Sequence, residues 1–106
     1  MAWISLAFAG LLEVVWAFFM KQSDGFSRLT PTVITFATMF ASFGLLSYAM
    51  KSLPLGTAYT VWTGIGAVGA FAVGVAVLGE SMNPMRVTAA ALIITGLVLM
   101  KLASPN

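Results

Sequence analysis

Hydrophobic residues gather in four long runs, and short polar stretches rich in glycine, proline and charge separate them. Each run has about 18–22 residues, close to the roughly 20 that a helix needs to cross a bilayer. Short connections make successive helices antiparallel neighbours, so both ends of the chain fall on the same side. The pattern predicts an all-α membrane protein with a single four-helix transmembrane domain over residues 1–106, its helices at about 2–20, 31–50, 57–78 and 85–102.

The composition supports a membrane protein and leaves little material for enzymatic chemistry. Of 106 residues, 60% are hydrophobic and 8% are charged, whereas soluble domains carry about 25% charged residues. Cysteine and histidine are absent, and the three acids, Glu13, Asp24 and Glu80, are far apart in sequence. We therefore expect no metal site, no cofactor and no enzyme activity. The five basic residues occur singly, so nucleic acid is not an expected partner.

The loop charges differ little between the two sides of the membrane. Lys51 and Lys101 fall on the side of the termini, whereas Lys21, Arg28 and Arg86 fall on the other. Because basic residues favour the cytoplasmic side, such a small bias hardly selects an orientation. The chain is then expected to insert both ways and to form an antiparallel, dual-topology homodimer, an inverted repeat made from two identical chains. The alternative is that loop charges are merely sparse and other signals fix the orientation.

Glu13 lies in the middle of the first run, the only charge between Ala2 and Met20. An ionised acid at that depth costs several kcal/mol or more unless it is paired, protonated or functional. Gly10 and Trp16 lie three residues before and after it, so all three share one side of a helix. Gly10 permits close approach to the carboxylate, and Trp16 offers an aromatic wall with an indole N–H. The alternatives are a neutral structural acid and an aromatic ring that faces lipid or core.

Two other helices carry polar or aromatic residues at helical spacing. Tyr59 and Trp62 share one face of the third run, where Tyr59 can donate a hydrogen bond and Trp62 can stack on a flat cation. Tyr59 also fits an interfacial aromatic belt. Ser42 follows Thr35 and Thr38 in a hydroxyl stripe on the second run. Membrane helices use such hydroxyls as interhelical links or bond them to their own carbonyls, and Ser42 fits a site equally well.

Small residues dominate the third run. Gly66 continues the face of Tyr59 and Trp62, and Gly66, Ala70 and Gly74 form a stripe at spacing four. Such a stripe permits close helix contact and can also allow a bend. The fourth run has no buried charge before Lys101, which indicates a dimerisation element rather than a cavity wall.

Three segments resemble a known family. The stretches GLLEVVWA (10–17), KSLPLGTAY (51–59) and TAYTVWTGIGAVGA (57–70) are similar to small multidrug resistance transporters, and the resemblance covers the whole chain. Trp16, together with Met39 in place of a tyrosine, resembles the guanidinium-exporter subtype rather than the drug-exporting branch.

The resemblance implies a homodimer of inverted protomers in the bacterial inner membrane that exchanges protons for guanidinium or a related small cation. It implies that Glu13 binds both the substrate and the proton, and that five residues line the site: Gly10, Trp16, Ser42, Tyr59 and Trp62. A broader exporter of quaternary ammonium and other drug cations is the alternative within the family. A channel or a small accessory membrane subunit is the alternative outside it.

Overall fold

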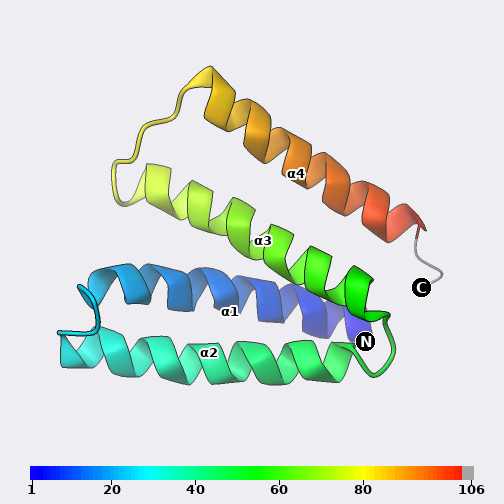
Figure 1. Cartoon of the computed structure of the whole chain (residues 1–106), viewed down its shortest axis with the longest axis horizontal. Coiled ribbons are helices and arrows are strands. Elements are labelled where there is room, and N and C mark those ends of the chain that lie inside the picture. Colours follow the sequence, from blue (N-terminus) through cyan, green and yellow to red (C-terminus); the bar gives the residue numbers. More distant parts are fainter. Residues whose placement is uncertain (104–106) are drawn as a thin grey trace.

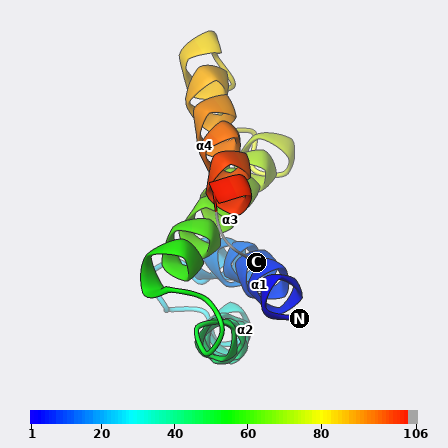
Figure 2. The same cartoon turned by 90° about the vertical axis from the view of Figure 1, so that its right-hand side faces the viewer.

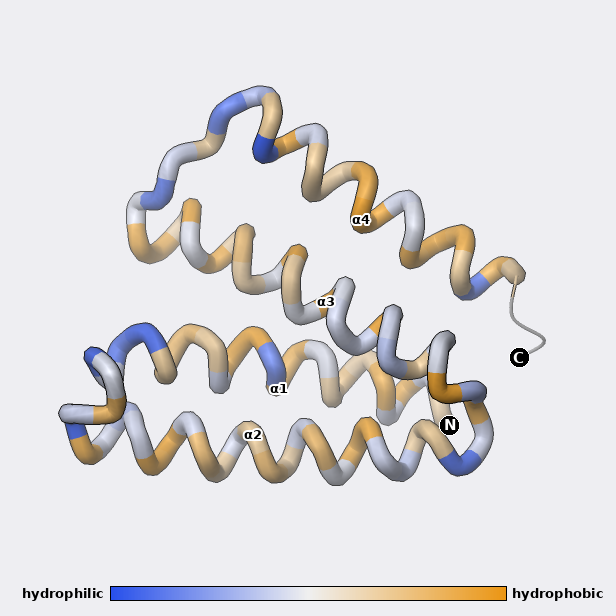
Figure 3. The backbone as a smooth tube through the Cα atoms, viewed as in Figure 1, coloured by the Kyte–Doolittle hydropathy of each residue, from blue (hydrophilic) through white to orange (hydrophobic). Residues whose placement is uncertain are grey.

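A computed structural model describes residues 1–103, so the last three positions of the expected 1–106 domain lie outside the described residues. Four helices account for nearly all of this part of the chain: α1 (Ala2–Gln22), α2 (Leu29–Ala49), α3 (Leu55–Ala76) and α4 (Pro84–Ala103). All four are long and apolar enough to cross a membrane. Hydrophilic residues gather at the connections, apart from a band near the middle of α1 (Figure 3). The all-α, four-span fold is therefore confirmed for residues 1–103.

The helices form an open row rather than a closed bundle. Seen end-on, α2, α1, α3 and α4 follow one another, and the molecule is only 16 Å thick along its shortest axis (Figure 2). The N-terminus, the α2–α3 turn and the end of α4 lie at one end, and the other two connections lie at the opposite end (Figure 1). The backbone of α4 packs against α3 alone among the described helices, with Leu97 lying over Gly64. One side of α4 is thus left without a neighbouring helix in the described part of the chain.

Proline and asparagine define where the helices begin. Pro31 lies in the first turn of α2 and Pro54 is the N-cap of α3, positions at which a missing N–H costs nothing. The Asn83 side chain accepts a hydrogen bond from the backbone N–H of Arg86 at 2.9 Å and so caps α4. These local preferences determine where α2, α3 and α4 begin.

The buried core lies at the end of the row that carries the N-terminus. It comprises apolar residues of the first half of α1, the second half of α2, the α2–α3 turn and the first half of α3: Leu6, Ala9, Leu46, Ala49, Leu53, Ala58, Val61 and Trp62. Glu13 lies beyond this core, toward the middle of α1. A packed end thus holds three helices in register beside the acid.

Glycines bring α1 and α3 into close contact around Glu13. Ile65 of α3 lies over Gly10, and Val14 of α1 lies over Gly69. Without a Cβ, each glycine admits a branched side chain from the opposite helix, as is common between membrane helices.

This contact predicts that Gly10→Ala destabilises the fold. An alanine Cβ would lie 2.6 Å from Ile65 Cγ2, so α1 and α3 must separate. We expect a loss of about 1–3 kcal/mol in the free energy of unfolding, as overpacked cores show. Thermal unfolding in detergent micelles measures it, with Gly44→Ala as the control, because a Cβ there meets nothing within 4 Å. Equal melting temperatures for the two variants would contradict the prediction.

Candidate functional site

Glu13 presses its carboxylate against the backbone of α3. The side chain is half-buried and lies so close to Gly66 that an added Cβ there would overlap the carboxylate. Its Oε1 atom is fully buried and accepts no hydrogen bond from the described residues. Buried polar atoms almost always have a partner, so an unpartnered carboxylate oxygen inside a membrane helix is unusual, and a proton or a cation is the kind of ligand that such an oxygen can bind.

Trp16 places a second unpartnered polar atom one turn further along α1. Its Nε1 is buried and donates no hydrogen bond within residues 1–103. The ring meets Phe43 of α2 edge-on, with centroids 6.4 Å apart and an interplanar angle of 73°. An indole N–H can only donate, so its natural partner is a carboxylate or carbonyl oxygen rather than a cation.

Ser42 and Trp62 connect three helices one turn before Glu13. Trp62 Nε1 donates to Ser42 Oγ at 3.0 Å, and the Ser42 hydroxyl donates to the carbonyl oxygen of Ala9 at 2.7 Å. Both side chains are buried. The Ser42 hydroxyl therefore links helices in the single chain, while Glu13 receives no hydrogen bond from it.

The other two hydroxyls of the α2 stripe bond to their own helix. Thr35 and Thr38 donate to the carbonyl oxygens of Pro31 and Ile34, each at 2.7 Å. This is the ordinary arrangement for threonine in a membrane helix. It leaves Ser42 as the only member of the stripe that reaches another helix among the described hydrogen bonds.

Four aromatic rings form a continuous row across the site. Phe43 lies between Trp16 and Trp62, with its centroid 5.9 Å from that of Trp62, and Tyr59 follows 5.5 Å beyond Trp62. Tyr59 is 53% exposed, so its ring touches the row through Trp62 while much of it faces away from the chain. The row provides flat apolar surfaces on which a planar cation can stack.

The structure thus brings the six predicted residues into one region, in different ways. Gly10, Glu13 and Trp16 share one side of α1, and Gly10 is covered by Ile65. Ser42 and Trp62 reach α1 at Ala9, and Tyr59 joins them only through a ring contact.

Two residues were missed as members of the site, Phe43 and Gly66. The sequence carried a signal for Gly66, which lies four residues after Trp62 on the same face of the helix. It carried none for Phe43, because an aromatic residue in an apolar run is unremarkable.

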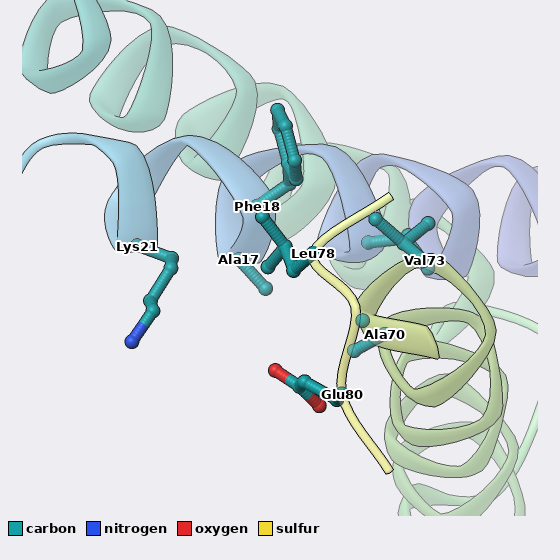
Figure 4. Close-up of a pocket in the computed structure, with 9 residues that line it drawn as sticks. Ala17, Phe18, Lys21, Ala70, Val73, Leu78 and Glu80 are labelled. Atoms are coloured by element: carbon teal, nitrogen blue, oxygen red, sulfur yellow. The ribbon is translucent and has the colours of Figure 1, made fainter. Parts of the chain in front are cut away.

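A cavity of about 130 Å³ opens in the seam between α1 and α3. Its α1 wall includes Val14 and Ala17, and its α3 wall includes Ala70 and Gly74 (Figure 4). A larger open groove of about 550 Å³ separates α3 from α4, and Tyr59 is among its lining residues. Residues 1–103 hold no group of three histidine, cysteine, aspartate or glutamate side chains that could ligate a metal.

Comparison with known proteins gives a consistent result. The family model described as Small Multidrug Resistance protein matches residues 1–93. The Guanidinium exporter of Escherichia coli strain K12 is 61% identical over 104 residues, which cover 98% of this chain and 99% of that protein. The Guanidinium exporter of Yersinia pseudotuberculosis is 60% identical, with 98% and 100% covered. That of Citrobacter freundii is 55% identical, with 98% and 99% covered.

A family match over most of the chain, near-complete coverage of these relatives and four membrane-spanning helices all agree. The protein is a multi-pass membrane protein, and it belongs to the Small Multidrug Resistance protein family.

Proposed function

We propose that this protein exports guanidinium across the bacterial inner membrane in exchange for protons. The observation that carries the proposal is the Glu13 carboxylate, held against Gly66 in the middle of a membrane helix with one oxygen buried and unpartnered. The relatives named Guanidinium exporter, at about 60% identity over nearly the whole chain, supply the substrate.

The chemistry of guanidinium suits this site. The ion is planar, stays charged at physiological pH, and presents N–H donors in a fork that matches the two oxygens of a carboxylate. Its flat faces can stack on the aromatic row that runs from Trp16 to Tyr59. A carboxylate in a low-dielectric environment attracts such a cation far more strongly than one in water.

Several features favour a second, inverted copy of the chain as the other half of the site. The molecule is an open slab, and no residue of α4 is buried in the single chain. The Trp16 indole N–H has no acceptor within residues 1–103, and the Tyr59 side chain is exposed. A second Glu13 across a dimer interface would supply an acceptor and a second charge. The weak loop-charge bias permits the inverted orientation.

Guanidinium and protons compete for the same carboxylates, and this competition couples guanidinium export to proton entry. Guanidinium and protons each neutralise the paired Glu13 residues, so one leaves when the other binds. If the dimer changes its open side only when the site is neutralised, protons entering down their gradient drive guanidinium out. No further coupling device is needed, and Ser42 and Trp62 maintain the helix positions around the exchange.

Glu13→Gln tests the shared carboxylate. We expect guanidinium binding to weaken by about 3–5 kcal/mol, the usual loss when one partner of a buried charge pair is removed. Guanidinium-driven proton flux in proteoliposomes should then fall at least about a hundredfold. Asp24→Asn, which removes a carboxylate from the exposed α1–α2 connection, is the matched control and should keep wild-type flux. Wild-type flux in Glu13→Gln would overturn the proposal.

Gly66→Ala tests the position of the carboxylate rather than its charge. The new Cβ would overlap the Glu13 carboxylate and displace it. We expect guanidinium affinity to fall about tenfold, within the range for overpacked contacts. Gly56→Ala on the same helix meets nothing within 4 Å and should bind like wild type. Calorimetric titration of both variants with guanidinium measures these affinities. Equal affinities would contradict the proposed placement of the Glu13 carboxylate against Gly66.

Single-cysteine labelling tests dual topology. Because the chain contains no cysteine, Ser52→Cys in the exposed α2–α3 turn provides one reporter that leaves every loop charge in place. In cells that express it, an impermeant maleimide should label about half of the chains from outside, with the rest labelled only after permeabilisation. Labelling from one face alone would eliminate the inverted dimer.

A further inference from the structure

The first turn of α4 carries a guanidinium group of the chain itself, packed against the connection that follows α3. Arg86 forms an ion pair with Glu80, with Nη2 and Oε1 3.6 Å apart. Arg86 Nη1 donates a hydrogen bond to the carbonyl oxygen of Ser81 at 2.6 Å and lies 3.4 Å from its hydroxyl. The guanidinium carbon lies 4.9 Å from the centre of the Phe71 ring. A carboxylate, a carbonyl and an aromatic face thus surround one guanidinium.

Helix stability alone does not favour this arrangement. Glu80 follows the C-terminal end of α3, and its N–H donates to the carbonyl oxygen of Gly74 at 3.0 Å. Arg86 lies in the first turn of α4. Helix dipoles favour cations at C-terminal ends and anions at N-terminal ends, so each of the two charges is at the unfavourable end.

Glu80 also lies at the mouth of the cavity in the seam between α1 and α3. Its carboxylate rests against Gly74, just as that of Glu13 rests against Gly66. The two glycines are eight residues apart, about 12 Å along the helix. In Figure 4 the Glu80 carboxylate points into the space between α1 and α3, with Lys21 on the opposite wall. The Lys21 charge disfavours a cation beside α1, so a cation at this mouth is best placed against Glu80.

We propose that Glu80, the Ser81 carbonyl and the Phe71 ring form a second guanidinium site, which Arg86 occupies as a tethered ligand and which free guanidinium can take over. The Glu80 and Arg86 side chains are 43% and 37% exposed, and ion pairs of this kind are weak. Free guanidinium at millimolar concentration competes with a tethered arginine, whose effective concentration is of the same order. The use of this site as an outer station for exported cation rests on the proposed function.

The test is a binding measurement on the full chain in lipid nanodiscs, with Glu13→Gln present throughout so that the central carboxylate does not contribute. Guanidinium chloride is titrated while amide NMR shifts of Phe71 and Ser81 are followed. Sodium chloride and tetramethylammonium chloride serve as controls for ionic strength and for a cation without N–H donors. Removing the tethered ligand with Arg86→Ala should lower the dissociation constant about threefold to fivefold, the modest factor that an exposed ion pair represents.

Adding Glu80→Gln to Arg86→Ala should abolish saturation. The inference is overturned if Arg86→Ala gives no saturable shift, if the shift survives Glu80→Gln, or if tetramethylammonium reproduces it. Arg86→Gln, which keeps a polar side chain, replaces Arg86→Ala if the α4 amides show that the latter is not folded.

The two proposals fail in different ways. Binding at Glu80 without guanidinium flux in the wild-type chain would refute the export function and leave this site standing. Flux in the wild-type chain without outer binding would refute this inference alone.

Discussion

The close approach of α1 and α3 governs the rest of the molecule. Gly10 admits Ile65, Gly66 admits Glu13, and together they bring a carboxylate into the contact between two backbones. No water of the bilayer core can solvate that carboxylate, and the described residues offer its buried oxygen no donor. On the proposed function, a proton, a guanidinium ion or a partner chain neutralises that carboxylate, and competition between proton and guanidinium exchanges one for the other.

The four helices follow directly from the lengths of the apolar runs, but their arrangement does not. Pro31 and Pro84 indicate where α2 and α4 begin, because proline lacks a backbone N–H and the first turn of a helix does not need one. The open row could not be anticipated, because lipid is as apolar as a protein core and hydropathy does not distinguish a buried face from a lipid-facing one. Nothing in the composition of α4 indicates that its backbone packs against α3 alone among the described helices and that it buries no residue.

The site was predictable where a residue type is unusual for its surroundings. A lone acid and nearby tryptophans stand out in an apolar helix, so Glu13, Trp16 and Trp62 could be named from the sequence as candidate site residues, and that role stays a prediction. The outcome for Ser42 was undetermined, because a hydroxyl can line a cavity or link helices; its bond to Ala9 links them in the single chain. Phe43 lies in the aromatic row only because α2 packs so that its ring comes between Trp16 and Trp62. This is a tertiary contact, and no local sequence pattern predicts it.

The carboxylates of Glu13 and Glu80 both lie against α3, but they differ in their exposure to water. This difference determines which of them would hold a cation more tightly. Glu13 is held in the membrane-spanning part without a partner, whereas Glu80 lies at the surface and is paired with Arg86. Because electrostatic attraction strengthens as the dielectric constant falls, a cation bound at Glu13 is held tightly and one at Glu80 loosely. A glycine of α3 lies beneath each acid, but Glu13 belongs to α1 whereas Glu80 directly follows α3, so a shift of α3 against α1 changes the Glu13 contact and leaves that of Glu80 in place. On the proposals made above, weak binding outside and strong binding inside would let the outer site release its cation quickly, while only neutralisation of the inner one commits the protein to exchange.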